Sequence, residues 1–244
     1  EFCHWFMLIL FVGWTAFFLF ILWRFHNSRQ PKADHDGMKS HFSSHLEVAV
    51  VIVEAVLLVG FAVPIWYQAV DQFPPEKESL VVRAVAEQYG WNFHYAGEDG
   101  RFGRGRPELV DGANPLGLTP EDPFGLDDVV VKNQMHVPVG QAVIVKITSK
   151  DVIHNYALPA MRVSQDAIPG MEIPLWFKAA QTSPTDELGM AVPYEIICGQ
   201  LCGGGHGLMR ATLYVDDGAA YDAWYQGQAK QLAGAVAEKT ASTR

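Results

Sequence analysis

Two long stretches near the start of the chain are almost purely apolar. Residues 5–23 contain no charged side chain, and residues 48–70 contain one, Glu54. Each stretch approaches the ~20 apolar residues that cross a bilayer as a helix. We expect membrane spans at about 5–24 and 46–67. The alternatives are an uncleaved signal peptide for the first stretch and buried core helices for both.

Polar residues between the two stretches predict where the second helix begins and which way the pair is oriented. The segment Ser44–Glu47 has the Ser-x-x-Glu spacing of a capping box, which predicts a helix start at Ser44. Basic residues cluster in the same loop, and the positive-inside rule then places this loop in the cytoplasm. Both termini, and everything after residue 70, are expected on the outer side. The basic residues are Arg24, Arg29, Lys32 and Lys39.

From residue 80 the period of the hydrophobic pattern changes to two, which is typical of half-buried strands. Many short strands separated by turn signals predict a sandwich or barrel. Residues 96–128 are rich in Gly, Pro and Asp and are expected to form a surface insertion. Aromatic residues at helical spacing after residue 218 predict a C-terminal helix. The predicted strands are 80–85, 89–95, 129–131, 135–137, 141–148, 173–177, 194–197 and 210–215.

Length and charge limit the classes of function. The 244 residues are enough for one ordinary domain with accessory segments. A formal net charge of −9 argues against nucleic acid as a partner. An acidic outer domain attracts a basic protein such as an electron carrier, although solubility alone also explains the charge.

One short stretch, residues 198–209, concentrates the metal-binding chemistry. Cys198, Cys202, His206 and Met209 supply two thiols, an imidazole and a thioether. Soft sulfur ligands with imidazole favour copper over magnesium or calcium. The intervening glycines permit a tight loop. A structural disulfide and a zinc site are the alternatives for the two cysteines.

The string Cys-x3-Cys-x3-His-x2-Met resembles the binuclear copper (CuA) loop of subunit II of haem–copper cytochrome c oxidases. Two upstream segments are also similar to this family. Residues 149–159 match its Ser-x-Asp-Val-x-His pattern, with His154 at the position of the second histidine ligand, and residues 166–170 match as well. The resemblance therefore has three anchors in the family's order.

This resemblance implies the fold class. We expect a two-helix transmembrane hairpin at 1–70, a cupredoxin-like β-sandwich at 71–217 with the insertion 96–128, and a helical tail at 218–244. It also implies the metal ligands, namely Cys198, Cys202, His154, His206, Met209 and the carbonyl of Gln200, holding two copper ions.

The implied function is that of the electron-accepting subunit of a respiratory terminal oxidase in the bacterial cytoplasmic membrane. The donor would be cytochrome c or a linked c-type haem carrier, as in bacterial supercomplexes with alternative complex III. Electrons would pass to haem in subunit I, where oxygen is reduced to water and protons are translocated. Subunit I, other oxidase subunits and membrane lipid are the expected partners.

Three positions depart from the family pattern or carry a second role in it. Tyr89 replaces the usual tryptophan at the electron entry point, and Trp91 nearby is a second candidate for electron entry. The alternative for both aromatics is ordinary core packing, which is favoured for Trp91. Gln200 replaces a glutamate that binds magnesium at the interface with subunit I. Glu47 matches a residue that admits protons to subunit I, and its alternative role is the capping box.

Three other classes of protein share part of this pattern. Nitrous-oxide reductase has a similar copper loop but carries a large propeller domain. Quinol oxidase subunit II has the hairpin and sandwich without the copper ligands. A copper carrier outside any oxidase would bind the metal but release it.

Overall fold

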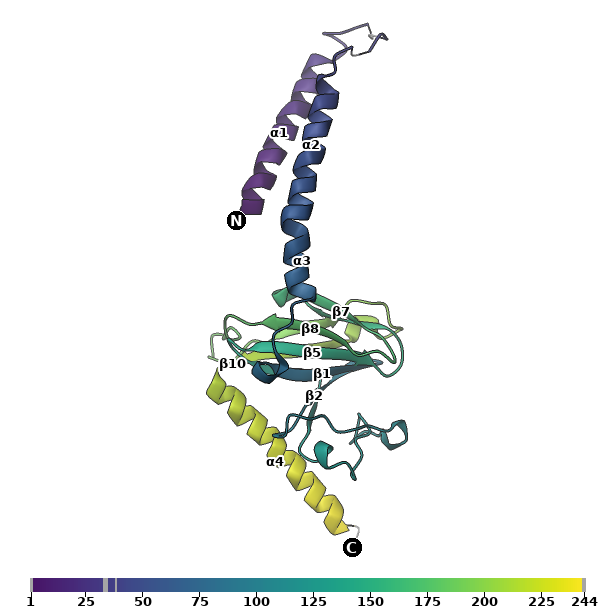
Figure 1. Ribbon diagram of the computed structural model, residues 1–244, viewed down its shortest axis with the longest axis vertical. Helices are drawn as coiled ribbons and strands as arrows, with labels where there is room; N and C mark the ends of the chain where they lie inside the picture. Colours follow the sequence, from purple (N-terminus) through teal and green to yellow (C-terminus); the bar gives the residue numbers. More distant parts are fainter. Residues whose placement is uncertain (1, 33–34, 38, 243–244) are drawn as a thin grey trace. The chain divides into compact units, whose positions relative to one another are not determined.

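The computed structural model describes residues 2–32, 35–37 and 39–242, which fall into two compact units, Glu1–Phe61 and Ala62–Arg244 (Figure 1). The first unit contains α1 (Phe2–Arg24) and α2 (Phe42–Leu57). The second helix continues beyond this unit through a π-helical turn, η1 (Leu58–Ala62), into α3 (Val63–Val70).

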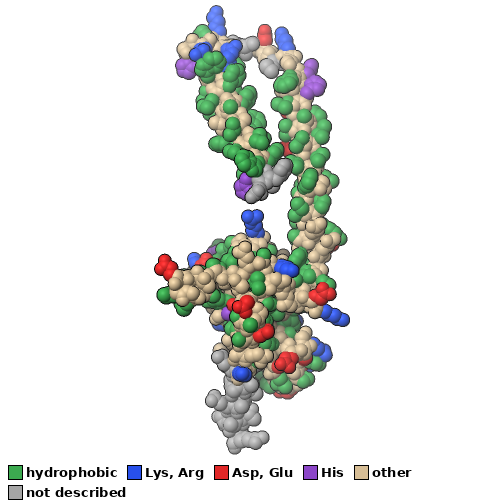
Figure 2. Space-filling model, turned by 90° about the vertical axis from the view of Figure 1, so that its left-hand side faces the viewer, with side chains coloured by type: hydrophobic (Ala, Val, Ile, Leu, Met, Phe, Trp, Pro, Cys, Tyr) green, Lys and Arg blue, Asp and Glu red, His purple; other side chains and the backbone are tan. Residues whose placement is uncertain are grey.

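Both helical segments are long and apolar enough to cross a membrane. In the most apolar part of each segment no residue is buried within the chain. This contradicts the alternative that both are core helices of a soluble protein. Hydrophobic side chains cover both helices in Figure 2. The basic residues Arg24, Arg29, Lys32 and Lys39 are exposed in or beside the connecting loop.

The second helix begins two residues before the predicted start, at Phe42, so the capping-box prediction is wrong. Its N-cap residue, His41, makes no capping side-chain hydrogen bond within the described part of the chain. The Phe42 N–H instead donates to Oγ of Ser40 at 3.2 Å. Because the helix begins at Phe42, Ser44 lies inside its first turn and is not the N-cap residue.

The second unit is built around two five-stranded sheets. One sheet has the order β3-β2-β1-β5-β8 and the other β4-β10-β9-β6-β7. The pairs β1·β5 and β4·β10 are parallel, and all other neighbouring strands are antiparallel. The strands are β1 (Leu80–Glu87), β2 (Gly90–Tyr95), β3 (Val129–Lys132), β4 (Gln134–Pro138), β5 (Ala142–Ser149), β6 (His154–Leu158), β7 (Val163–Ala167), β8 (Ile173–Lys178), β9 (Tyr194–Cys198) and β10 (Arg210–Asp216).

Two of these strands, β6 and β7, were not predicted from the sequence. The polar residues Ser164, Gln165 and Asp166 make β7 a poor strand by composition. It forms because β7 pairs along its whole length with β6, which in turn pairs with β9. Tertiary pairing therefore overrides local preference here.

The core lies between the sheets. Trp91 and Phe93 from the first sheet and Tyr156 and Leu213 from the second are fully buried. The indole of Trp91 packs edge-on against the ring of Tyr156, with centroids 5.5 Å apart. This contact joins the sheets directly beneath the edge that carries the metal-binding candidates.

Residues 96–128 connect β2 to β3 with two short 3-10 turns, η3 (Pro107–Leu109) and η4 (Pro123–Gly125). The segment is anchored by a buried carboxylate, because Oδ2 of Asp128 lies 2.6 Å from Nε2 of His94 and accepts the Gly103 N–H at 2.7 Å.

The chain ends in α4 (Gly218–Ser242), whose first turns pack on the sandwich. The Trp224 ring stacks on the imidazole of His136, with centroids 4.2 Å apart, and Tyr225 donates its hydroxyl to the Ala96 carbonyl. Two apolar N-terminal helices, a β-sandwich and a C-terminal helix confirm the predicted fold class.

Candidate metal centre

The segment from the end of β9 to the start of β10 carries five of the six predicted ligands, four side chains and the Gln200 carbonyl. Cys198 is the last residue of β9, and Met209 comes directly before β10. These strands are antiparallel neighbours, so the loop must reverse the chain within eleven residues. A 3-10 turn, η6 (His206–Leu208), shapes its second half, and Gly203 has a φ of 132° that side chains rarely tolerate.

The loop brings its sulfur and nitrogen atoms to one point. Sγ of Cys198 and Sγ of Cys202 are 3.8 Å apart. Sγ of Cys202 lies 3.7 Å from Nδ1 of His206 and 3.8 Å from the Met209 sulfur. The carbonyl oxygen of Gln200 lies 3.1 Å from Sγ of Cys198, whereas the Gln200 residue as a whole is exposed.

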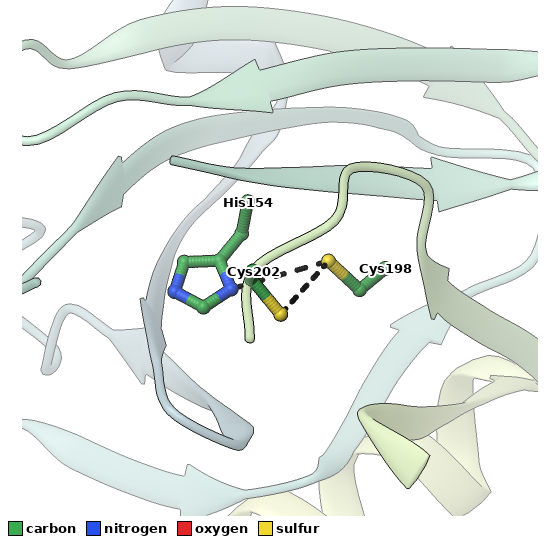
Figure 3. A group of neighbouring side chains, drawn as sticks. All are labelled: His154, Cys198 and Cys202. Atoms are coloured by element: carbon green, nitrogen blue, oxygen red, sulfur yellow. Dashed lines mark hydrogen bonds between the residues drawn. The ribbon is translucent and has the colours of Figure 1, made fainter. Parts of the chain in front are cut away.

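His154 joins this group from β6, although 44 residues separate it from Cys198. Its Nδ1 lies 3.9 Å from Sγ of Cys198, and the nearest ligand atoms of His154, Cys198 and Cys202 lie within 4.8 Å of one another (Figure 3). The pairing of Tyr156 in β6 with Cys198 in β9 sets this register.

Asp151 orients the His154 ring. Its Oδ1 lies 2.8 Å from Nε2 of His154, so a proton on Nε2 leaves the Nδ1 lone pair facing the sulfurs. Partial burial raises the pKa of Asp151, but hydrogen bonds from His154 and from the Gln88 and Val152 amides outweigh burial and hold this pKa below its ordinary value. Asp151 therefore stays ionised beside the ring.

Most of the donor side chains are shielded from solvent. His154, Cys198, Cys202 and Met209 are all buried, and His206 is partly buried. Burial, with the neighbouring Cys198 thiol, raises the pKa of the Cys202 thiol to about 11. A metal that binds here must therefore displace a proton.

The chemistry of this set fits copper. Both cysteines are free thiols, and their 3.8 Å separation is far from the ~2.05 Å of a disulfide bond. Two thiolates, two imidazoles, a thioether and a carbonyl give six donors, whereas a structural zinc site closes with four cysteine or histidine ligands. Thiolate, thioether and imidazole donors suit copper. The structure thus brings all six proposed donor atoms together.

Tyr89 and Trp91 occupy different environments. Tyr89 is 42% exposed and its ring lies against the ligand loop, since a Cβ on Gly205 would come within 2.5 Å of that ring. Trp91 is fully buried, with its ring centroid 6.3 Å from that of His154. Trp91 thus packs in the core beneath a proposed ligand.

Glu47 lies on α2, in the other compact unit, and is exposed in the isolated chain. Two further residues contact the site although neither was proposed as a site residue: Asp151 contacts His154, and Gln88 contacts the loop at the Cys202 carbonyl. Asp151 could have been found, because it stands three residues before His154. Gln88 carries no such local signal.

These features define a class. A two-sheet sandwich whose edge loop gathers cysteine, histidine and methionine side chains, joined to two apolar helices, is a membrane-attached cupredoxin-like metal protein.

Comparison with known proteins identifies the family within this class. Residues 80–215 match the family model for the cytochrome c oxidase subunit II periplasmic domain. The chain is 31% identical to the alternative cytochrome c oxidase subunit 2 of Bradyrhizobium diazoefficiens over 232 residues, covering 94% of this chain and 78% of the relative. It is 30% identical to cytochrome c oxidase subunit 2 of Cereibacter sphaeroides over 246 residues, which covers 91% of this chain and 75% of the relative.

The chain therefore belongs to the cytochrome c oxidase subunit II family and is a membrane-bound subunit of an oxidoreductase complex. Among solved structures it is similar to the periplasmic domain of subunit II of cytochrome oxidase from Bradyrhizobium japonicum. That match has a TM-score of 0.47 and 24% identity, and covers 66% of this chain and 99% of that one.

Proposed function

We propose that this chain is the electron-accepting subunit of a respiratory terminal oxidase and that its metal centre is a binuclear copper (CuA) site. The observation that carries the proposal is the convergence of six donor atoms from two separate segments. These are the side chains of Cys198, Cys202, His154, His206 and Met209 and the carbonyl of Gln200.

The protein residues supply a rigid, water-poor shell for this centre. Asp151 fixes the His154 ring, and buried positions hold both cysteines and Met209. Copper, when bound, supplies reversible one-electron chemistry. A shell whose ligands are already placed suits this task, because little has to move when the charge changes.

The proposed electron donor is cytochrome c or a linked c-type haem carrier such as that of alternative complex III. The net charge of −9 supports a basic carrier. We assign electron entry to Tyr89, which is partly exposed and touches the loop, and a packing role to buried Trp91. The proposed acceptor is haem in subunit I, where oxygen would be reduced to water with proton translocation.

The membrane part supports a topology with the basic loop in the cytoplasm and both termini, with the copper domain, outside. Residues 1–70 would form the membrane hairpin, 71–217 the copper domain and 218–244 the tail. Glu47 would then lie near the cytoplasmic end of α2, where it would admit protons to subunit I. Gln200 would face a magnesium site that is weakened by the missing carboxylate.

Metal analysis and electron paramagnetic resonance of the full chain in detergent test the proposal. We expect two copper ions per chain and a paramagnetic resonance spectrum in which one unpaired electron is shared between both ions. One copper per chain, or zinc alone after copper loading, contradicts it. A copper carrier would instead lose its visible spectrum quickly to a chelator, whereas a resident centre persists.

A further inference from the structure

The turn between β1 and β2 lies against the ligand loop. Nε2 of Gln88 donates a hydrogen bond to the carbonyl oxygen of Cys202 at 2.6 Å, across 114 residues of sequence. The next residue, Tyr89, covers the following stretch of the loop. A Cβ on Gly203 would come within 2.6 Å of the Tyr89 hydroxyl, and one on Gly205 within 2.5 Å of its ring.

Gln88 makes a second contact with the site through its backbone. Its backbone N–H donates to Oδ2 of Asp151 at 2.7 Å, and Oδ1 of the same carboxylate lies 2.8 Å from His154. One residue thus touches the carboxylate that orients His154 and the peptide group that follows Cys202.

The loop needs such a contact because its own sequence does not select one conformation. Three consecutive glycines, Gly203–Gly205, follow Cys202, and glycine has the largest conformational freedom of any residue. The first half of the loop is held by Asn155, whose carbonyl accepts the Gly199 N–H at 3.0 Å. The second half, between Cys202 and His206, has one hydrogen bond of its own, from the His206 N–H to the Gly203 carbonyl at 3.1 Å, and is otherwise contacted by Gln88 and Tyr89.

We propose that Gln88 is a positioning residue of the metal centre, whose side-chain amide fixes the peptide after Cys202 and thereby the placement of His206 relative to the Cys202 sulfur. In the structure these atoms lie 3.7 Å apart. Ligands that are placed before the metal arrives lose less conformational freedom on binding, so the contact favours retention of the metal. The inference rests on the proposed copper function.

The side chain at position 88 must donate a hydrogen bond for this role. Methionine has similar length and flexibility but no donor, so Gln88→Met removes the bond alone. An ionised carboxylate cannot donate and repels the Cys202 carbonyl, so Gln88→Glu should be worse at neutral pH. A protonated carboxyl can donate again. Gln141→Met, at an exposed glutamine directly before β5, is the matched control.

The test uses the full chain in detergent, loaded with copper. Gln88→Met should still bind two copper ions, but should show altered copper hyperfine splitting and a shifted reduction potential. It should lose copper to a chelator about 3–10-fold faster, the range expected for one ordinary hydrogen bond. The loss rate of Gln88→Glu, relative to Gln88→Met at the same pH, should fall as the pH is lowered through ~4.5. Gln141→Met should match the parent protein.

A readout without metal separates this inference from the copper proposal. In the reduced, metal-free chain, Gln88→Met should raise the alkylation rate of Cys202 relative to Cys198 several-fold, as followed by peptide mass spectrometry. If the parent chain does not hold two copper ions, the proposed function fails, and the alkylation ratio still tests the loop contact. If the spectrum, potential, copper-loss rate and alkylation ratio of Gln88→Met all equal those of the parent, Gln88 has no positioning role.

Discussion

Oδ1 of Asp151 lies 2.8 Å from Nε2 of His154, while the other nitrogen of the same ring faces Sγ of Cys198 at 3.9 Å. The carboxylate therefore decides which nitrogen is free for a metal. It also accepts the Gln88 and Val152 amides, so its own position is fixed.

We predict that Asp151→Asn weakens copper binding about 10–100-fold, as is typical when the partner of a ligating histidine is changed. An amide oxygen can still accept from His154, but the negative charge is lost. Chelator competition, followed by the visible spectrum of the full chain, measures the effect. Asp222→Asn, at an exposed aspartate on α4, is the control and should bind copper like the parent. Equal affinity in the two variants would show that Asp151 does not tune the ligand.

Gln200 allows its backbone and side-chain roles to be separated. Its carbonyl lies 3.1 Å from Sγ of Cys198, and the residue is exposed. We predict that Gln200→Glu leaves the copper spectrum nearly unchanged, because the backbone ligand is the same. In the assembled oxidase it should strengthen binding of manganese, used as a paramagnetic substitute for magnesium, because a carboxylate restores negative charge. A disrupted copper spectrum with unchanged manganese binding would reverse this assignment of roles.

Glu47 does not form a capping box with Ser44, because α2 begins at Phe42 and Ser44 is not its N-cap. The proton-entry role is the remaining prediction for this residue. We predict that Glu47→Gln in the assembled oxidase slows proton uptake and turnover. Glu47→Asp, which keeps a carboxyl group, should retain most of both. Stopped-flow measurements with a pH indicator can follow the uptake. Unchanged rates in Glu47→Gln would exclude a role in proton entry.

The lowered pKa of Glu87, at the end of β1, predicts that the fold loses stability in acid. Partial burial raises the pKa of Glu87, but hydrogen bonds from Lys150 and Lys132 outweigh burial and lower it to about 2, from an ordinary value of 4.5. A carboxylate with a lowered folded-state pKa stabilises the fold above its unfolded value, and this stabilisation is lost as pH falls from ~4.5 toward 2.

We expect Glu87→Gln to cost roughly 1–2 kcal/mol at pH 7. This is less than the full pKa shift implies, because the lysines keep contact with water. The difference from the parent should shrink steadily below pH 4.5. Unfolding followed by tryptophan fluorescence of the chain measures the difference, with exposed Glu187→Gln as the control. A difference that stays constant down to pH 3 contradicts the ion-pair explanation.

Local patterns were sufficient to predict the membrane helices, most strands and four of the proposed ligands. An uncharged apolar run such as residues 5–23 predicts a span by its length and composition. Cys198, Cys202, His206 and Met209 lie in one loop, so their spacing is itself a chemical signal. His154 was predicted only through resemblance to a family, since nothing local to a single histidine distinguishes a ligand from a core residue.

The tertiary structure decided how distant segments meet at the site. The register that pairs Tyr156 with Cys198 brings His154 to the sulfurs, and β6 was absent from the predicted strands. The β1–β2 turn brings Gln88 to Cys202, and the burial of Trp91 distinguishes it from exposed Tyr89. Strand register and sheet order depend on packing between residues far apart in sequence, and short-range hydrophobic periodicity carries no information about them.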